Sequence, residues 1–97
     1  PFSPSAKPRL DPQSCPAEQN WTEGQEEILE CRSRGHPDPV LECSRDGHSM
    51  DPGIPHLADR AQAGLYLCRA RNELGTAERN VTLRVLCESG GFGGEFG

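Results

Sequence analysis

Five cysteines carry the most reactive side chains of this 97-residue chain, and their spacing limits what they can do. Cysteine thiolates bind zinc, but zinc sites usually contain close ligand pairs such as Cys-x-x-Cys. No such pair is present, so we predict disulfides, which form in an oxidising compartment and seldom in the cytosol. The cysteines are Cys15, Cys31, Cys43, Cys68 and Cys87.

Two tripeptides match the acceptor sequence for N-linked glycosylation, Asn-x-Ser/Thr without a central proline. They begin at Asn20 and Asn80. The second lies where Val81, Leu83 and Val85 alternate with polar residues, so Asn80 is predicted to face solvent on a strand. We predict glycosylation at both asparagines, with an unoccupied polar surface residue as the alternative at each.

No set of residues in the sequence has the spacing of a catalytic site or a metal site. His36, His48 and His56 lie near several aspartates, but in or beside predicted loops and without the short fixed spacing of a ligand pair. No Ser/His/Asp or Cys/His set of a nucleophilic enzyme is apparent, and cysteines in disulfides cannot act as nucleophiles. We expect no catalytic residue, no metal and no cofactor.

The composition argues against nucleic-acid binding and against a membrane span. The net charge is −5, whereas nucleic-acid binders usually carry a basic patch on a basic domain. No run of 18 apolar residues is present. Only 33% of the residues are hydrophobic, and a chain of this size with so thin a core usually needs disulfides.

Short strands are the elements that would position these residues. We expect six or seven of them with turns every eight to twelve residues, which is typical of an all-β sandwich. Residues 1–8 are predicted to be a linker, residues 9–87 a domain, and residues 88–97 a Gly-rich flexible tail. Within the domain we predict an edge strand over 9–16, a turn over 20–24, and further strands over 26–33, 40–45, 54–57, 64–71 and 76–86.

One of these strands has a distinctive pattern. The sequence Gly64-x-Tyr66-x-Cys68 places Tyr66 and Cys68 on the same face. A tyrosine two residues before a core cysteine resembles the tyrosine corner of immunoglobulin-like sandwiches, in which the hydroxyl bonds back to the backbone. The following Ala-x-Asn-x-x-Gly resembles the turn between the last two strands of such domains. The resemblance implies a two-sheet antiparallel sandwich of about seven strands.

More of the sequence, over residues 8–86, resembles the later, membrane-side domains of the intercellular adhesion molecules, and most of all a fifth domain. Two positions depart from the general immunoglobulin pattern. Cys43 stands where a core tryptophan is usual, and Gln62 stands where an aspartate usually joins a salt bridge at the base of the sandwich. The pieces that carry the resemblance are Pro8-Arg9-Leu10-Asp11, Cys15-Pro16, Asn20-Trp21-Thr22-Glu23-Gly24, Cys31, Gly35-His36-Pro37-Asp38-Pro39, Cys43-Ser44-Arg45-Asp46-Gly47 and Gly64-Leu65-Tyr66-Leu67-Cys68-Arg69-Ala70.

Four of the cysteines allow three pairings. The general immunoglobulin pattern gives Cys31–Cys68 between the sheets and leaves Cys15 and Cys43. The alternative is Cys15–Cys31 with Cys43–Cys68, each joining neighbouring strands of one sheet, and the resemblance to the adhesion molecules favours it. Cys87 is left over, and it either pairs with another chain or reflects the end of the fragment.

The resemblance implies an extracellular module of a cell-surface glycoprotein in cell–cell adhesion, and no enzyme. Adhesion molecules of this family bind leukocyte integrins through an acidic residue of the first domain. A late domain would be a stiff, glycosylated stalk that also self-associates, while the integrin contact and the anchor of this single-pass membrane protein lie outside the fragment. The alternatives are an immunoglobulin domain of an unrelated neural or receptor surface protein, and a small secreted enzyme or metal-dependent protein.

Overall fold

The strongest alternation in the sequence forms the long strand β9 (Gly75–Leu86), in which Val81 and Leu83 are buried and Asn80 and Arg84 are exposed. In the computed structural model, which describes residues 4–87, β9 lies inside a five-stranded sheet of order β2-β9-β8-β5-β6. The other members are β2 (Glu18–Thr22), β5 (Val40–Arg45), β6 (His48–Ser49) and β8 (Gly64–Asn72).

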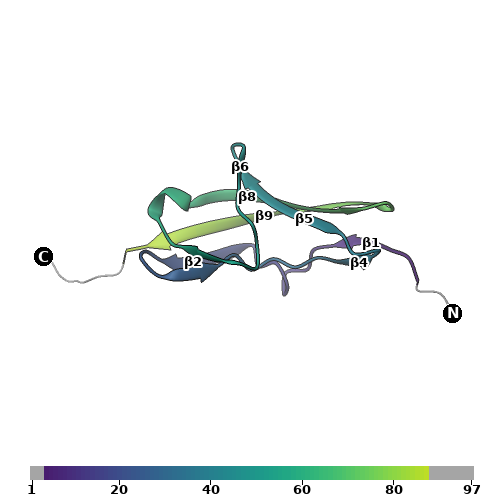
Figure 1. Ribbon diagram of the computed structural model, residues 1–97, viewed down its shortest axis with the longest axis horizontal. Helices are drawn as coiled ribbons and strands as arrows, with labels where there is room; N and C mark the ends of the chain where they lie inside the picture. Colours follow the sequence, from purple (N-terminus) through teal and green to yellow (C-terminus); the bar gives the residue numbers. More distant parts are fainter. Residues whose placement is uncertain (1–3, 88–97) are drawn as a thin grey trace, which may run out of the picture.

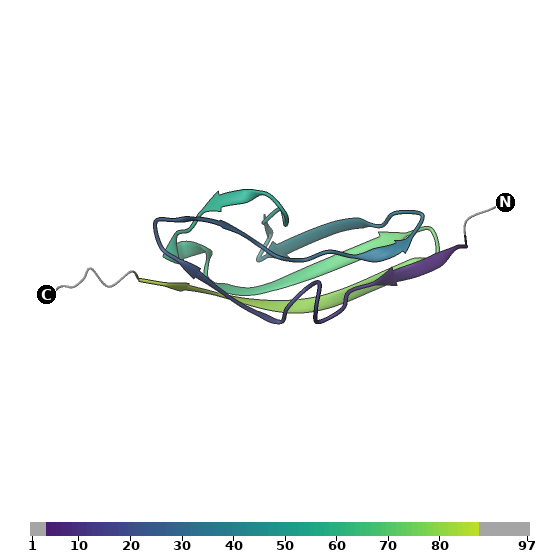
Figure 2. The same cartoon turned by 90° about the horizontal axis from the view of Figure 1, so that it is seen from below.

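The second layer consists of two short antiparallel pairs that cover the inner face of this sheet (Figures 1 and 2). One pair is β1 (Ala6–Arg9) with β4 (Arg34–His36), and the other is β3 (Glu26–Ile28) with β7 (Pro55–Leu57). A single chain segment, residues 26–36, runs through both pairs. The structure is therefore the all-β, two-layer sandwich that the sequence predicts.

The N-terminal half of the sandwich differs from the prediction in four ways. The predicted strand over 26–33 ends at Ile28, and residues 34–36 form a separate strand, β4. β1 begins at Ala6, so the predicted boundary between linker and domain falls inside a strand. Residues 10–16 form a turn instead of an edge strand, because the Asp11 carbonyl accepts from the N–H groups of Ser14 (3.1 Å) and Cys15 (2.7 Å). Residues 20–22 of the predicted turn belong instead to strand β2, which pairs with β9 in parallel.

A few residues contribute most of the core, and Trp21 is the largest of them. Its side chain is 2% exposed, and its ring stacks on His56 with the ring centroids 6.1 Å apart. The core therefore contains a tryptophan from β2, although Cys43 stands where a core tryptophan is usual. The other buried members are Cys15, Leu29, Cys31, Cys43, Met50, Ala58, Tyr66, Cys68, Val81 and Leu83.

A single 3-10 turn, η1 (Arg60–Gln62), precedes β8. No helix among the described residues is long and apolar enough to cross a membrane. The predicted Gly-rich tail, residues 88–97, lies outside the described residues, as do residues 1–3 of the predicted linker.

Candidate functional site

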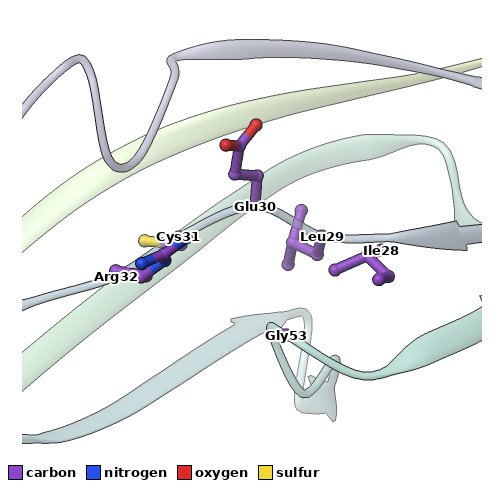
Figure 3. Close-up of a pocket in the computed structure, with 6 residues that line it drawn as sticks. All are labelled: Ile28, Leu29, Glu30, Cys31, Arg32 and Gly53. Atoms are coloured by element: carbon purple, nitrogen blue, oxygen red, sulfur yellow. The ribbon is translucent and has the colours of Figure 1, made fainter.

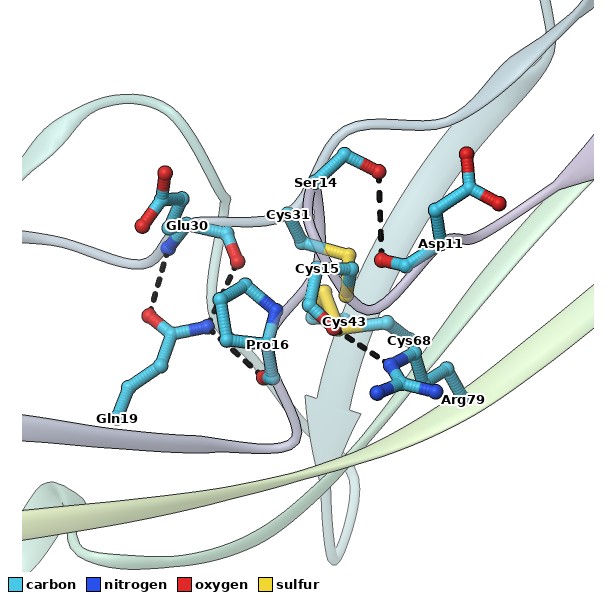
Figure 4. Close-up of a disulfide and its surroundings, with 10 residues drawn as sticks. All are labelled: Asp11, Ser14, Cys15, Pro16, Gln19, Glu30, Cys31, Cys43, Cys68 and Arg79. Atoms are coloured by element: carbon cyan, nitrogen blue, oxygen red, sulfur yellow. Dashed lines mark hydrogen bonds between the residues drawn. A yellow bond between two sulfur atoms is a disulfide. The ribbon is translucent and has the colours of Figure 1, made fainter.

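Four of the five cysteines meet inside the sandwich (Figure 4). Cys43 of β5 and Cys68 of β8 are direct register partners and form a disulfide with their Cα atoms 3.9 Å apart. Cys15 and Cys31 form the second disulfide, also with a Cα separation of 3.9 Å. The prediction that this second bridge joins two strands is wrong, because Cys15 lies in the turn after Asp11 and Cys31 between β3 and β4.

The two disulfides are adjacent. The Sγ atoms of Cys15, Cys31 and Cys68 all lie within 4.8 Å of one another. Within residues 4–87 this is the one group of three cysteine, histidine or acidic side chains with that closeness, and all three sulfurs are oxidised. A disulfide sulfur offers no thiolate to a metal ion, so the cluster staples the core. Cys87 is exposed and has no disulfide partner among the described residues.

Side chains next to the Cys15–Cys31 disulfide bond the two layers together (Figure 4). The amide of Gln19 on β2 donates to the Glu30 carbonyl (2.7 Å) and accepts from the Glu30 N–H (2.8 Å), as a neighbouring strand would. From β9, Arg79 Nε donates to the carbonyl of Cys15 (2.5 Å). No local pattern in the sequence indicates either residue, because each bond joins positions far apart along the chain.

Tyr66 makes the hydrogen bond of a tyrosine corner. Its side chain is 3% exposed, and its hydroxyl donates to the carbonyl of Gln62 at 2.6 Å. The guanidinium of Arg45 lies 5.6 Å from the centre of the tyrosine ring. Burial raises the pKa of the Tyr66 hydroxyl above its ordinary value, and the positive charge of Arg45 offsets part of that rise.

The salt bridge usual at the base of such a sandwich cannot form through Gln62, because its side chain carries no charge. The guanidinium of Arg45 bonds to the backbone there. It donates to the backbone carbonyls of Ala61 (3.0 Å) and Ala63 instead of a carboxylate. A Cβ atom at Gly64 would lie 2.6 Å from Nη1 of Arg45, so only glycine leaves room for this contact. The Gln62 side chain accepts from the N–H of Asp59 (2.9 Å) and helps to cap η1.

Both glycosylation sequences lie on the outer face of the five-stranded sheet. Asn20 of β2 and Asn80 of β9 are exposed, and Asn20 is the register partner of Arg84. Arg84 and Asn80 are four residues apart on β9, so they share a face. Neither asparagine points into the core, so a glycan on either would lie outside the sandwich.

The same outer face carries a row of charged residues across three strands. Arg69 of β8 lies between its register partners Glu42 on β5 and Glu78 on β9. The Arg69 guanidinium bonds the Glu78 carboxylate at 2.7 Å. Glu42 is exposed, but a cation stands directly opposite it.

Figure 3 shows the groove along the segment that carries Cys31. It has a volume of about 420 Å³, and Gly53 closes its other side by donating its N–H to the Leu29 carbonyl (3.0 Å). The Glu30 side chain points away from Gly53. The lining contains no nucleophile with an adjacent base, so this groove supports no catalytic role. The lining residues are Ile28, Leu29, Glu30, Cys31, Arg32 and Gly53.

Solved structures share this architecture. No protein-family model matches the chain. A chain of the complex between titin M10 and an obscurin-like 1 Ig domain superposes with a TM-score of 0.66 and 27% identity, covering 86% of this chain and 97% of that one. The Sidekick-1 immunoglobulin domains 1–5 give a TM-score of 0.70 at 22% identity, covering 88% of this chain and 21% of theirs. At 22% identity, the similarity to Sidekick-1 shows a shared fold and nothing more.

Sequence relatives narrow the assignment. Intercellular adhesion molecule 1 of Bos taurus is 46% identical over 81 residues, which is 81% of this chain and 15% of the relative. Intercellular adhesion molecule 5 of Homo sapiens is 41% identical over 80 residues, which is 80% of this chain and 9% of the relative. The chain is an immunoglobulin-like domain homologous to part of the intercellular adhesion molecules. It spans less than one sixth of either relative, and both relatives are named as adhesion molecules and not as enzymes.

The tyrosine corner predicts how this immunoglobulin-like domain responds to alkali. Because the folded-state pKa of Tyr66 is raised, the corner's full stabilisation is present below pH of about 10 and is lost as the pH rises through the folded-state pKa. Tyr66→Phe should cost about 1 kcal/mol at neutral pH, since the hydrogen bond to Gln62 is lost, and should then show less additional loss above pH 10.

Denaturation of both forms at several pH values measures this effect. Tyr66 is the one tyrosine of the chain, so the absorbance of the phenolate reports its ionisation directly. Parallel alkaline losses of stability in the two forms would contradict the prediction.

The bridge between β2 and Glu30 predicts a second effect on the immunoglobulin-like domain. Gln19→Ala removes two hydrogen bonds that join the layers and should lower the free energy of unfolding by about 1–2 kcal/mol. Gln13→Ala is the matched control, because Gln13 is exposed and makes no side-chain hydrogen bond to the described residues; its effect should stay within about 0.5 kcal/mol. Urea denaturation compares the two, and equal losses would argue against the bridge.

Proposed function

We propose that this chain is an extracellular spacer module of a cell-surface adhesion glycoprotein whose integrin contact lies in other domains. The observation that carries the proposal is the placement of its ends. In both views β1 lies at one end of the sandwich and the C-terminal end of β9 at the opposite end (Figures 1 and 2). A module with this geometry adds its own length to a row of domains.

Stiffness is the second requirement of a spacer, and two features supply it. The Cys43–Cys68 disulfide joins β5 to β8 within the five-stranded sheet. The adjacent Cys15–Cys31 disulfide joins the turn before β2 to the segment between β3 and β4. At the end where the chain enters, the Asn72 amide donates to the carbonyls of Ala6 (2.9 Å) and Pro37 (3.0 Å), so β1 is held to the turn between β8 and β9. Force applied along the module therefore meets covalent and hydrogen-bonded connections.

The charges of the outer face favour a spacer over an integrin contact. An acidic residue that completes the coordination of a divalent cation needs a carboxylate free to bind. Glu42 lies on a central strand, but its register partner is Arg69, and the positive charge of this side chain, although paired with Glu78, would repel a divalent cation at Glu42. We propose that the parent protein binds leukocyte integrins elsewhere, and that this domain occupies a membrane-proximal, fifth-domain-like position with self-association as a further property.

Binding and graft assays test the proposal. The 97-residue chain, secreted from glycosylating cells, should not bind a leukocyte integrin ectodomain in Mg²⁺. Inserted between an integrin-binding first domain and a membrane anchor, it should increase cell adhesion relative to the same protein without it, and Glu42→Gln should change nothing. Mg²⁺-dependent binding by the chain alone, abolished by Glu42→Gln, would make it the contact domain and overturn the spacer assignment. Sedimentation of the secreted chain tests self-association separately.

A further inference from the structure

The outer face of the five-stranded sheet exposes leucines in its middle. Leu65 on β8 is 57% exposed, and Leu67, two residues along on the same face, is half-buried. We call these two residues the leucine patch. Exposed apolar surface on a sheet is unfavourable in water unless something covers it.

A glycosylation sequence lies directly beside the leucine patch. In the antiparallel pairing of β8 with β9, Asn80 is the register partner of Leu67, and Thr82 is the register partner of Leu65. Directly opposed residues have Cβ atoms about 4.5–5.5 Å apart and side chains on one face. The asparagine that would carry a glycan therefore stands next to the apolar side chains, at the distance of a contacting pair.

We propose that the first N-acetylglucosamine of a glycan on Asn80 packs over Leu65 and Leu67 and so stabilises the fold. The inference rests on the glycosylation that the proposed function includes. A pyranose ring presents C–H groups on its face and polar groups on its rim, so its face can cover apolar surface while its rim stays hydrated. The occupant is part of the same molecule, and its attachment holds it beside the patch.

The second glycosylation sequence provides a matched comparison. Asn20 lies on the same outer face, but its register partner is Arg84, which is also 3.9 Å from the Glu18 carboxylate. A single leucine, Leu86, lies opposite Thr22 of that sequence. A sugar on Asn20 would rest over charged groups, so removing it should change stability less than removing the sugar on Asn80.

Melting temperatures of defined glycoforms test the inference. The whole chain carrying Asn20→Gln is secreted from mammalian cells that make high-mannose glycans, and mass spectrometry establishes the occupancy of Asn80. Trimming to one N-acetylglucosamine with an endoglycosidase should leave Tm unchanged, whereas Asn80→Gln should lower Tm by about 4 °C. Unglycosylated chains from the bacterial periplasm, with and without Asn80→Gln, show what the substitution itself does.

A second pair of variants ties the effect to the leucine patch. Leu65→Thr with Leu67→Thr introduces β-branched side chains, which are favourable in a strand, and removes most of the apolar surface. In that background the Tm difference between glycosylated and Asn80→Gln forms should fall below about 1 °C.

Three results would overturn the inference. The first is a Tm difference between glycosylated and Asn80→Gln forms that persists without the leucines. The second is a trimmed form with the same Tm as Asn80→Gln, and the third is a secreted chain with no glycan on Asn80. In the parent chain, secreted in parallel with its Asn20 intact, a glycan on Asn20 together with intact disulfides would leave the extracellular spacer function standing in each case. Free thiols and no glycan at either site would instead remove the proposed function itself.

Discussion

Replacing Cys43 and Cys68 together with alanine is expected to lower the free energy of unfolding by about 3–5 kcal/mol. The two residues are 25 positions apart, and their disulfide limits the unfolded chain across that loop. Both side chains are buried, and the Cys68 sulfur lies within 4.8 Å of the sulfurs of Cys15 and Cys31, so the variant also loses contacts in the core. Domains of this size are stable by only about 5–15 kcal/mol, so the loss is a large fraction of the total.

Guanidinium denaturation without reductant measures this loss. Cys87→Ala is the control for removing a thiol, because Cys87 is exposed and unpaired in the described part of the chain, and its effect should remain within about 0.5 kcal/mol. Peptide mapping of the unreduced protein checks the premise. A Cys31–Cys68 linkage would contradict the pairing, and equal stability of the double variant and the parent would contradict the expected contribution.

Trp21→Ala is expected to cost about 3–5 kcal/mol, the range for deleting a large buried aromatic side chain. Trp21 is 2% exposed and packs between the layers, where its ring stacks on His56. Its removal leaves a cavity beneath β2, a strand with no other buried residue. The change keeps Asn20 in an acceptor sequence, so glycosylation is unaffected by the substitution.

Circular dichroism follows the unfolding of this variant, since Trp21 is the one tryptophan and its fluorescence is lost. Leu74→Ala is the control for truncating an apolar side chain at the surface, because Leu74 is exposed; it should cost much less. Trp21→Phe should recover part of the loss by keeping an aromatic ring against His56. A Trp21→Ala protein as stable as Leu74→Ala would show that β2 does not hold the core.

The sequence alone determined the features that depend on neighbouring residues. Alternation over 76–86 predicts β9, because successive side chains of a strand point to opposite faces. The same rule places Tyr66 and Cys68 together inside and Asn80 outside, and all three positions agree with the structure. The paired prolines of 36–39 likewise predict the break before β5, since proline cannot donate to a strand ladder.

Only the tertiary structure decided which distant residues meet. Three sulfurs lie within 4.8 Å of one another, so spacing along the chain could not choose among the disulfide pairings. β2 has one buried residue, Trp21, and therefore no periodicity that sequence reasoning could detect. The bonds of Gln19 with Glu30 and the register that pairs Asn80 with Leu67 are set by packing across the whole sandwich and not by any local run of residues.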